Sequence, residues 1–114
     1  MNYKYVATKL LPLSNCLRRH YACVIIKDNK IIGTGYNHSL TGCTTCHREG
    51  LEHNVGDYAE CQSIHAEQMA LLNSDNSDLR GSTLYLVSDK DNNPKPCPIC
   101  QRMMDWAGVK LGVE

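Results

Sequence analysis

One histidine and one Cys-x-x-Cys pair have the residue types that best suit a metal ion. His65 lies in the segment Ile-His-Ala-Glu, and Cys97 and Cys100 lie further along in Pro-Cys-Pro-Ile-Cys. An imidazole and two thiolates suit tetrahedral zinc whose fourth position is left to water, which is the catalytic arrangement. Two alternatives remain open: a redox pair of cysteines, and a structural zinc site with His65 as a third ligand.

Glu67 is the candidate for the proton transfers that such a site needs, because zinc lowers the pKa of a bound water to about 7 and a base must still move protons. Two residues on a regular helix point about 200° apart. His65 and Glu67 can therefore share a site only if His65 lies at the very start of its helix and Glu67 reaches back. Pro98 suits the first turn of a second helix, which would place Cys97 and Cys100 there. Two helix N-termini would then favour thiolates and a developing anion.

The chain has seven cysteines, and five lie outside this pair. Cys23 falls within a predicted strand, where we expect a buried apolar filler. The others could form a closed structural zinc site of four thiolates: Cys16, Cys43, Cys46 and Cys61. His47 or His53 could replace one of them, and reduced free thiols are the alternative interpretation.

Composition narrows the class of protein. The 114 residues carry 12 Lys and Arg against 12 Asp and Glu, which argues against a dedicated nucleic-acid or membrane-surface binder. No apolar run approaches the roughly 20 residues of a membrane span, and the opening segment does not resemble a signal peptide. An odd cysteine count without a secretion signal disfavours a disulfide framework. We therefore expect a cytoplasmic chain that forms a single domain over residues 1–114.

The elements that must position these residues follow from periodicity and turn signals. We expect a helix in residues 5–13, a β-hairpin of residues 21–26 and 31–36, and an irregular segment at 37–62. A helix at 64–72, a strand at 83–87, a helix at 98–107 and a short strand at 109–113 follow. Gly108 is the predicted C-cap of the last helix, and Trp106 is predicted to lie in the core. Strand–helix–strand crossovers imply some parallel pairing, with helices packed on the sheet.

Taken together, the motifs resemble the zinc-dependent cytidine and deoxycytidylate deaminases. His-Ala-Glu followed by Pro-Cys-x-x-Cys is the signature of that family. The similarity extends to SNCLRR at 14–19, ACVIIKD at 22–28, GTGYN at 33–37 and CQRMM at 100–104. It implies a three-layer α/β fold with a mixed sheet of at least four strands flanked by helices. The fold would be C-terminally short, because relatives usually add a fifth strand and another helix.

The resemblance also implies a reaction, the hydrolysis of dCMP to dUMP and ammonia. His65, Cys97 and Cys100 would hold the catalytic zinc. Glu67 would take a proton from the zinc-bound water, and the hydroxide would attack C4 of cytosine. Glu67 would then protonate N3 and the departing amino group.

Substrate contacts are implied as well. The backbone N–H of Ala66 would contact the base carbonyl and Asn37 the sugar, although an Asn after a strand is often only a turn residue. Arg18 and Arg19 could bind the phosphate by bidentate contacts, or could simply be solvated. Some deoxycytidylate deaminases carry a second zinc in the region of the remaining cysteines.

Three functions stay open at this stage. The leading function is deamination of a free pyrimidine nucleotide, and we expect neither a polynucleotide nor a membrane as partner. The second is a deaminase for another amino-bearing base: cytidine, guanine or a polynucleotide base. The third is a catalytically silent zinc-held interaction module, which would have no need for Glu67. An open strand edge invites pairing, so we also expect a homo-oligomer. Two departures from the family, the loop at 88–96 and His38 after Tyr36-Asn37, leave the amino-group contacts and allosteric control undetermined.

Overall fold

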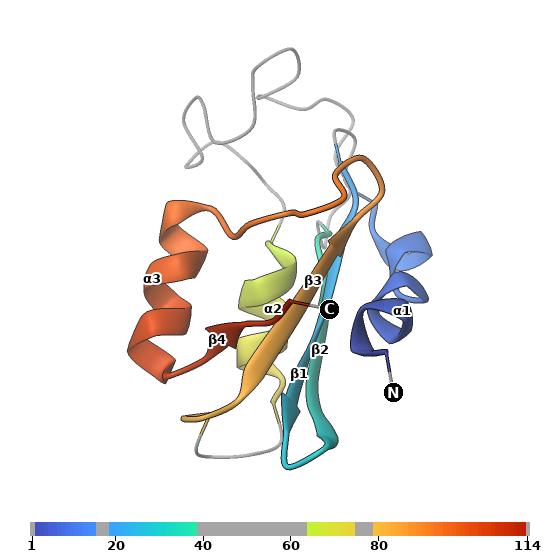
Figure 1. Ribbon diagram of the computed structural model, residues 1–114. Coiled ribbons are helices and arrows are strands. Elements are labelled where there is room, and N and C mark those ends of the chain that lie inside the picture. The colour runs from blue at the N-terminus through green and yellow to red at the C-terminus, as the bar shows by residue number, and fades with distance from the viewer. Residues whose placement is uncertain (1, 16–18, 39–63, 75–78, 114) are drawn as a thin grey trace.

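The computed structural model describes residues 2–15, 19–38, 64–74 and 79–113. These residues form three layers, with α1 on one face of a sheet and α2 and α3 on the other (Figure 1). The elements are α1 (Tyr3–Thr8), the 3-10 helix η1 (Leu11–Leu13), β1 (Tyr21–Lys27), β2 (Lys30–Tyr36), α2 (Ala66–Leu72), β3 (Thr83–Ser88), α3 (Pro98–Ala107) and β4 (Lys110–Leu111). The predicted order of elements and the predicted three-layer α/β fold are confirmed.

The predicted hairpin of β1 and β2 is present and antiparallel. Its turn residues Asp28 and Asn29 have φ angles of 52° and 62°. Two consecutive left-handed residues define the turn that best matches the twist of paired strands, and Asp and Asn tolerate that conformation. The register shifts at Ile25 and Ile26, so one extra residue of β2 is accommodated there.

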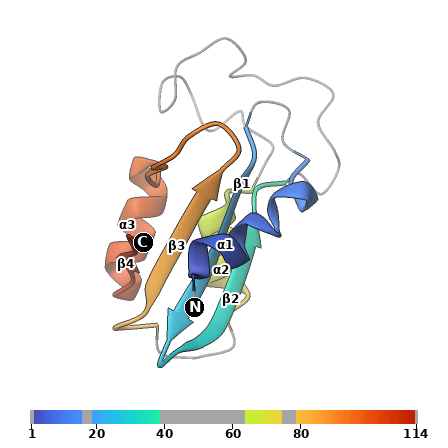
Figure 2. The same cartoon turned by 45° about the vertical axis from the view of Figure 1, so that its right-hand side comes forward.

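The sheet order is β2-β1-β3-β4, with β1 between β2 and β3 (Figure 2). β1 runs antiparallel to both neighbours, whereas β4 runs parallel to β3 after the α3 crossover. This mixed sheet agrees with the crossover prediction. The last strand is shorter than predicted, because only Lys110 and Leu111 pair with β3.

Both faces of β1 are buried, so its residues divide between two cores. Ala22, Val24 and Ile26 pack on the side of α1, while Cys23 and Ile25 pack on the side of α2 and α3. This alternation is the two-residue period of a strand. The prediction that Cys23 is a core filler is confirmed, because its side chain is fully buried.

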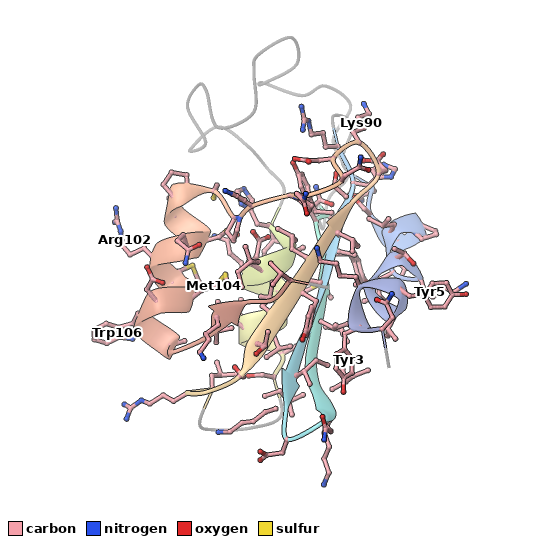
Figure 3. All side chains as sticks on the ribbon, in the orientation of Figure 1. Tyr3, Tyr5, Lys90, Arg102, Met104 and Trp106 are labelled. Carbon is pink, nitrogen blue, oxygen red and sulfur yellow. The ribbon has the colours of Figure 1, made fainter. Side chains whose placement is uncertain are left out.

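The prediction that Trp106 lies in the core is wrong. Trp106 is 91% exposed and points away from α3 on the same side as Arg102, whereas Met104 points toward the sheet (Figure 3). α3 needs only one apolar stripe to cover the sheet, and Cys100 and Met104 provide it. Gly108 ends the helix as predicted, with a left-handed φ of 78°.

Gly33 and Gly35 allow α2 to lie directly on the backbone of β2. A Cβ at Gly33 would come within 2.7 Å of the Ala70 carbonyl oxygen. A Cβ at Gly35 would collide with the Ala66 carbonyl oxygen, and would lie 2.8 Å from the Ala70 nitrogen. Backbone atoms cannot move aside as side chains can, so side chains at these two positions would push α2 away from the sheet.

Gly35→Ala should therefore displace α2 and lower the free energy of unfolding by about 3 kcal/mol, the upper range for overpacking. Urea denaturation monitored by circular dichroism measures this loss. Thr34→Ala, at the neighbouring half-buried position of β2, is the control and should cost much less. A Gly35→Ala protein as stable as the Thr34→Ala protein would contradict the close-packing argument.

Candidate active site

Two helix N-termini bring the predicted metal ligands together. His65 is the N-cap of α2. Cys97 is the N-cap of α3, and Pro98 follows it as the first residue of that helix. The His65 backbone is extended, and its N–H donates to the side-chain oxygen of Gln68 at 3.0 Å. The geometric requirement that His65 lie at the very start of its helix is therefore met.

The three side chains have the spacing of a tetrahedral metal site. His65 Nδ1 lies 3.2 Å from Cys100 Sγ and 3.5 Å from Cys97 Sγ. All three ligand atoms lie within 4.8 Å of one another. Zinc bonds to nitrogen and sulfur at tetrahedral angles separate the ligand atoms by about 3.5–3.8 Å, so the donor set fits zinc in both chemistry and size.

The two thiols have pKa values that are shifted in opposite directions. A hydrogen bond from the Cys100 thiol, helped by His65 and the backbone N–H of Cys100, lowers the pKa of Cys97 to about 4 against the opposing effect of burial. The same hydrogen bond raises the pKa of Cys100. One thiolate beside one thiol is the arrangement that a cation can complete by displacing the remaining proton.

Glu67 lies beside this cluster in the first turn of α2 and is only 5% exposed. Burial raises the pKa of its carboxyl group, and the negative charge of Cys97 adds to the rise. A hydrogen bond from its own backbone N–H and the charge of His65 act in the opposite direction. A carboxyl group with a raised pKa is suited both to take up a proton and to release it.

Asn37 lies near the cluster but serves the fold in this structure. A backbone bridge between His38 and Ile64 joins the end of β2 to the residue before His65. The Asn37 side chain is buried, and its oxygen accepts from the Ser14 hydroxyl at 2.6 Å and from the Tyr21 N–H at 2.8 Å. Its amide nitrogen donates to the Arg19 carbonyl oxygen at 2.8 Å. Contact with a sugar stays a prediction.

Of the remaining predicted site residues, the structure describes some and not others. Ala66 is buried at the first position of α2, where a backbone N–H has no acceptor within the helix. Arg19 is half-buried just before β1. The others lie outside the described residues: Arg18, Cys16, Cys43, Cys46 and Cys61.

Sequence reasoning missed Tyr21 as a neighbour of the site. Tyr21 begins β1 and packs against the core on the side of α2 and α3. Its phenol interacts electrostatically with Glu67. The strand alternation could have found it, because Tyr21 lies two residues before the buried Cys23 and so shares its face.

Comparison with known proteins identifies relatives along almost the whole chain. Residues 2–113 match the model of the cytidine and deoxycytidylate deaminase zinc-binding region. The chain is 35% identical to a deoxycytidylate deaminase of Mycobacterium phage D29, over 92% of this chain and 84% of that protein. It is 30% identical to the human deoxycytidylate deaminase over 78% of this chain, but spans only 48% of that protein.

A solved structure with the same fold supports this relationship. The dCMP deaminase of cyanophage S-TIM5, in complex with dCMP and dUMP, aligns with a TM-score of 0.68 and 30% identity. The alignment covers 96% of this chain and 75% of the phage chain.

Removal of one ligand should remove the metal. Cys100→Ala should lose about one zinc ion per chain and lower the melting temperature, because metal binding free energy is coupled to folding. Atomic absorption on the purified protein measures the metal. Cys23→Ala, which removes a buried thiol of the core, is the matched control and should keep the zinc. Equal metal content in both variants would contradict the assignment of the ligands.

Proposed function

Because the chain belongs to the cytidine and deoxycytidylate deaminase family, we propose that it is a zinc-dependent hydrolase that converts dCMP and water to dUMP and ammonia. The observation that carries the proposal is the buried Glu67 carboxyl next to the cluster of His65, Cys97 and Cys100. A zinc site that only stabilises the fold does not need a carboxyl group for proton transfer. The choice of dCMP is supported by the names of the phage and human relatives and by the nucleotides bound in the cyanophage structure.

In this proposal His65, Cys97 and Cys100 hold the zinc ion. Zinc, when bound, supplies Lewis acidity that makes water a nucleophile near neutral pH. Glu67 takes a proton from the attacking water and delivers it to N3 of the cytosine ring. The water oxygen bonds to C4, and Glu67 then moves the proton of that new hydroxyl group to the exocyclic amino group, so that the C4 carbonyl forms, the C4–N bond breaks and ammonia leaves. Burial keeps bulk water from exchanging these protons.

The rest of the chain would orient the nucleotide. The Ala66 N–H points out of the first turn of α2, where it can donate to the base carbonyl. Asn37 would contact the sugar with the part of its amide that the fold leaves available. Arg18 and Arg19 would neutralise the phosphate, because guanidinium groups bind phosphate with paired hydrogen bonds.

We also propose a second, structural zinc ion held by the remaining cysteines: Cys16, Cys43, Cys46 and Cys61. All four lie outside the described residues. The support is chemical, since four thiolates with one Cys-x-x-Cys spacing form a closed zinc site.

Assembly and location complete the proposal. We expect a single domain that forms homo-oligomers, since β2 is an edge strand of the sheet in the described part of the chain and an edge can pair. We also propose a cytoplasmic location, because seven cysteines are an odd number, which is not typical of the disulfide frameworks of secreted proteins. Among the described residues, no helix has the length and apolar character needed to cross a membrane.

Ammonia release from a panel of substrates tests the function directly. The panel contains dCMP, CMP, cytidine, deoxycytidine, cytosine and guanine, and dCMP should be turned over fastest.

Glu67→Gln should retain zinc and fold while kcat falls by about 10²–10⁴, the usual contribution of a general acid–base. Asp105→Asn removes a carboxylate that accepts from Gln101 on the exposed side of α3, and should leave kcat unchanged.

The panel separates the alternatives. Preference for a nucleoside or for guanine would replace dCMP with another amino-bearing base as substrate. Inertness toward every compound, with zinc bound, would favour a silent zinc-held interaction module. Undiminished turnover by Glu67→Gln would rule out the proton-transfer role.

Metal counting tests the second zinc. The wild-type chain should hold about two zinc ions, and a Cys43→Ala/Cys46→Ala variant should hold about one and keep the catalytic ion. One zinc ion per active wild-type chain would show that the remaining cysteines are free thiols.

A further inference from the structure

Asn37 lies where the end of β2 meets the segment that leads into the metal cluster. It follows the last residue of β2, and its backbone N–H donates to the Tyr21 carbonyl at 3.1 Å. The next residue, His38, exchanges two backbone hydrogen bonds with Ile64, at 2.8 and 3.1 Å. Ile64 directly precedes His65 in the chain. Asn37 is therefore adjacent to the backbone pair that leads into His65.

The partners of the Asn37 side chain determine which end of its amide is the oxygen. A backbone N–H can only donate, and a backbone carbonyl can only accept. The Tyr21 nitrogen lies 2.8 Å from Oδ1, and the Arg19 carbonyl oxygen lies 2.8 Å from Nδ2. A flipped amide would set donor against donor and acceptor against acceptor, so these contacts allow only one orientation.

Ser14 occupies the remaining acceptor position of this amide. Its Oγ lies 2.6 Å from Asn37 Oδ1, and both residues are 7% exposed. The amide oxygen has no proton, so the Ser14 hydroxyl must be the donor. The two lone pairs of Oδ1 then accept from the Tyr21 N–H and from Ser14. Nδ2 has two protons, and the described residues provide an acceptor for only one of them, the Arg19 carbonyl.

We propose that Ser14 is a positioning residue for the sugar of the nucleotide, because its hydroxyl fills the last acceptor position of the Asn37 amide and leaves that amide with one N–H to donate. The inference rests on the proposed function, since it requires a nucleotide as ligand. Ser14 acts through Asn37 and touches neither the ligand nor the metal. The amide then binds a ligand group only if that group accepts, as the 3′-hydroxyl oxygen of a deoxynucleotide does.

The Ser14 contact restrains the amide in a way that the other two contacts do not. The last side-chain torsion of asparagine is broad, so an amide with few partners samples a range of orientations. The Arg19 and Tyr21 partners belong to the segment that enters β1. Ser14 lies at the end of η1, where its N–H donates to the Leu11 carbonyl at 3.1 Å. The amide is thus held between two segments, and a hydrogen bond accepted by its oxygen also strengthens its remaining N–H as a donor.

Binding of dUMP and of its 2′,3′-dideoxy analogue to the zinc-loaded protein, measured by calorimetry, tests this role. The analogue lacks the 3′-hydroxyl, so it cannot accept from Asn37. The wild-type protein should prefer dUMP about tenfold, which corresponds to one hydrogen bond. Ser14→Ala should reduce this preference about fivefold by weakening dUMP binding, while binding of the analogue stays unchanged.

Ser82→Ala is the matched control. Ser82 is a fully buried serine whose hydroxyl donates to the Leu79 carbonyl at 2.6 Å, the same length as the Ser14 contact. It directly precedes β3, at the opposite end of that strand from Ser88, which pairs with Tyr21. Loss of this hydroxyl should lower the stability of the protein and leave its preference for dUMP unchanged.

Steady-state kinetics give an independent measurement. A contact with the sugar is made equally in the ground state and in the transition state, so its loss weakens substrate binding without slowing the chemical step. Ser14→Ala should therefore raise KM for dCMP and leave kcat close to that of the wild type.

Three results would overturn the role of Ser14. Equal weakening of dUMP and the dideoxy analogue by Ser14→Ala would mean that the hydroxyl only stabilises the fold. An unchanged preference in Ser14→Ala, or a wild-type protein without any preference for dUMP, would also contradict it. If the wild-type protein releases ammonia from dCMP, these results leave the proposed function intact, whereas a protein inert toward dCMP would overturn that function itself.

Discussion

The contact of α2 with the backbone of β2 at Gly33 and Gly35 is the constraint on which the active site depends. Helix and strand backbones approach so closely there that no side chain fits between them. This contact fixes the distance of α2 from the sheet and the direction of its axis. It thereby fixes the position of His65 at the N-cap and of Glu67 in the first turn. A metal site tolerates only small displacements of its ligands, so the absence of two Cβ atoms is a requirement of the chemistry as well as of the fold.

Charge is distributed around the site in a way that favours a cation and a proton carrier together. The N-termini of α2 and α3 converge there, and their partial positive charges stabilise thiolates. The pKa of Cys97 is lowered and that of Cys100 is raised, so a metal ion bound by both would have to displace the proton of Cys100. Glu67 is buried beside them, and burial holds its proton more tightly than water would.

Two aromatic residues show that residue type alone does not predict where a side chain lies in the fold. Trp106 is predicted to lie in the core, yet α3 covers the sheet with Cys100 and Met104 and leaves Trp106 exposed. Tyr21 gave no signal as a single residue, yet the strand register places it on the active-site face. In both cases the position of the side chain depends on the surface against which its helix or strand packs. Residues far apart in the chain form that surface, so a local pattern does not reveal it.

Residue type and short spacing were enough to predict the hairpin with its Asp-Asn turn, the order of helices and strands, and the Gly108 cap, all of which the structure contains. They also predict a ligand set and a proton carrier. Only the tertiary structure decided that His65 and Cys97 cap two converging helices, and that Asn37 is bonded to the segment before β1. The physical reason is that such contacts join residues far apart in the chain, and their geometry is fixed by the register of the sheet and by the packing of α2 on glycine.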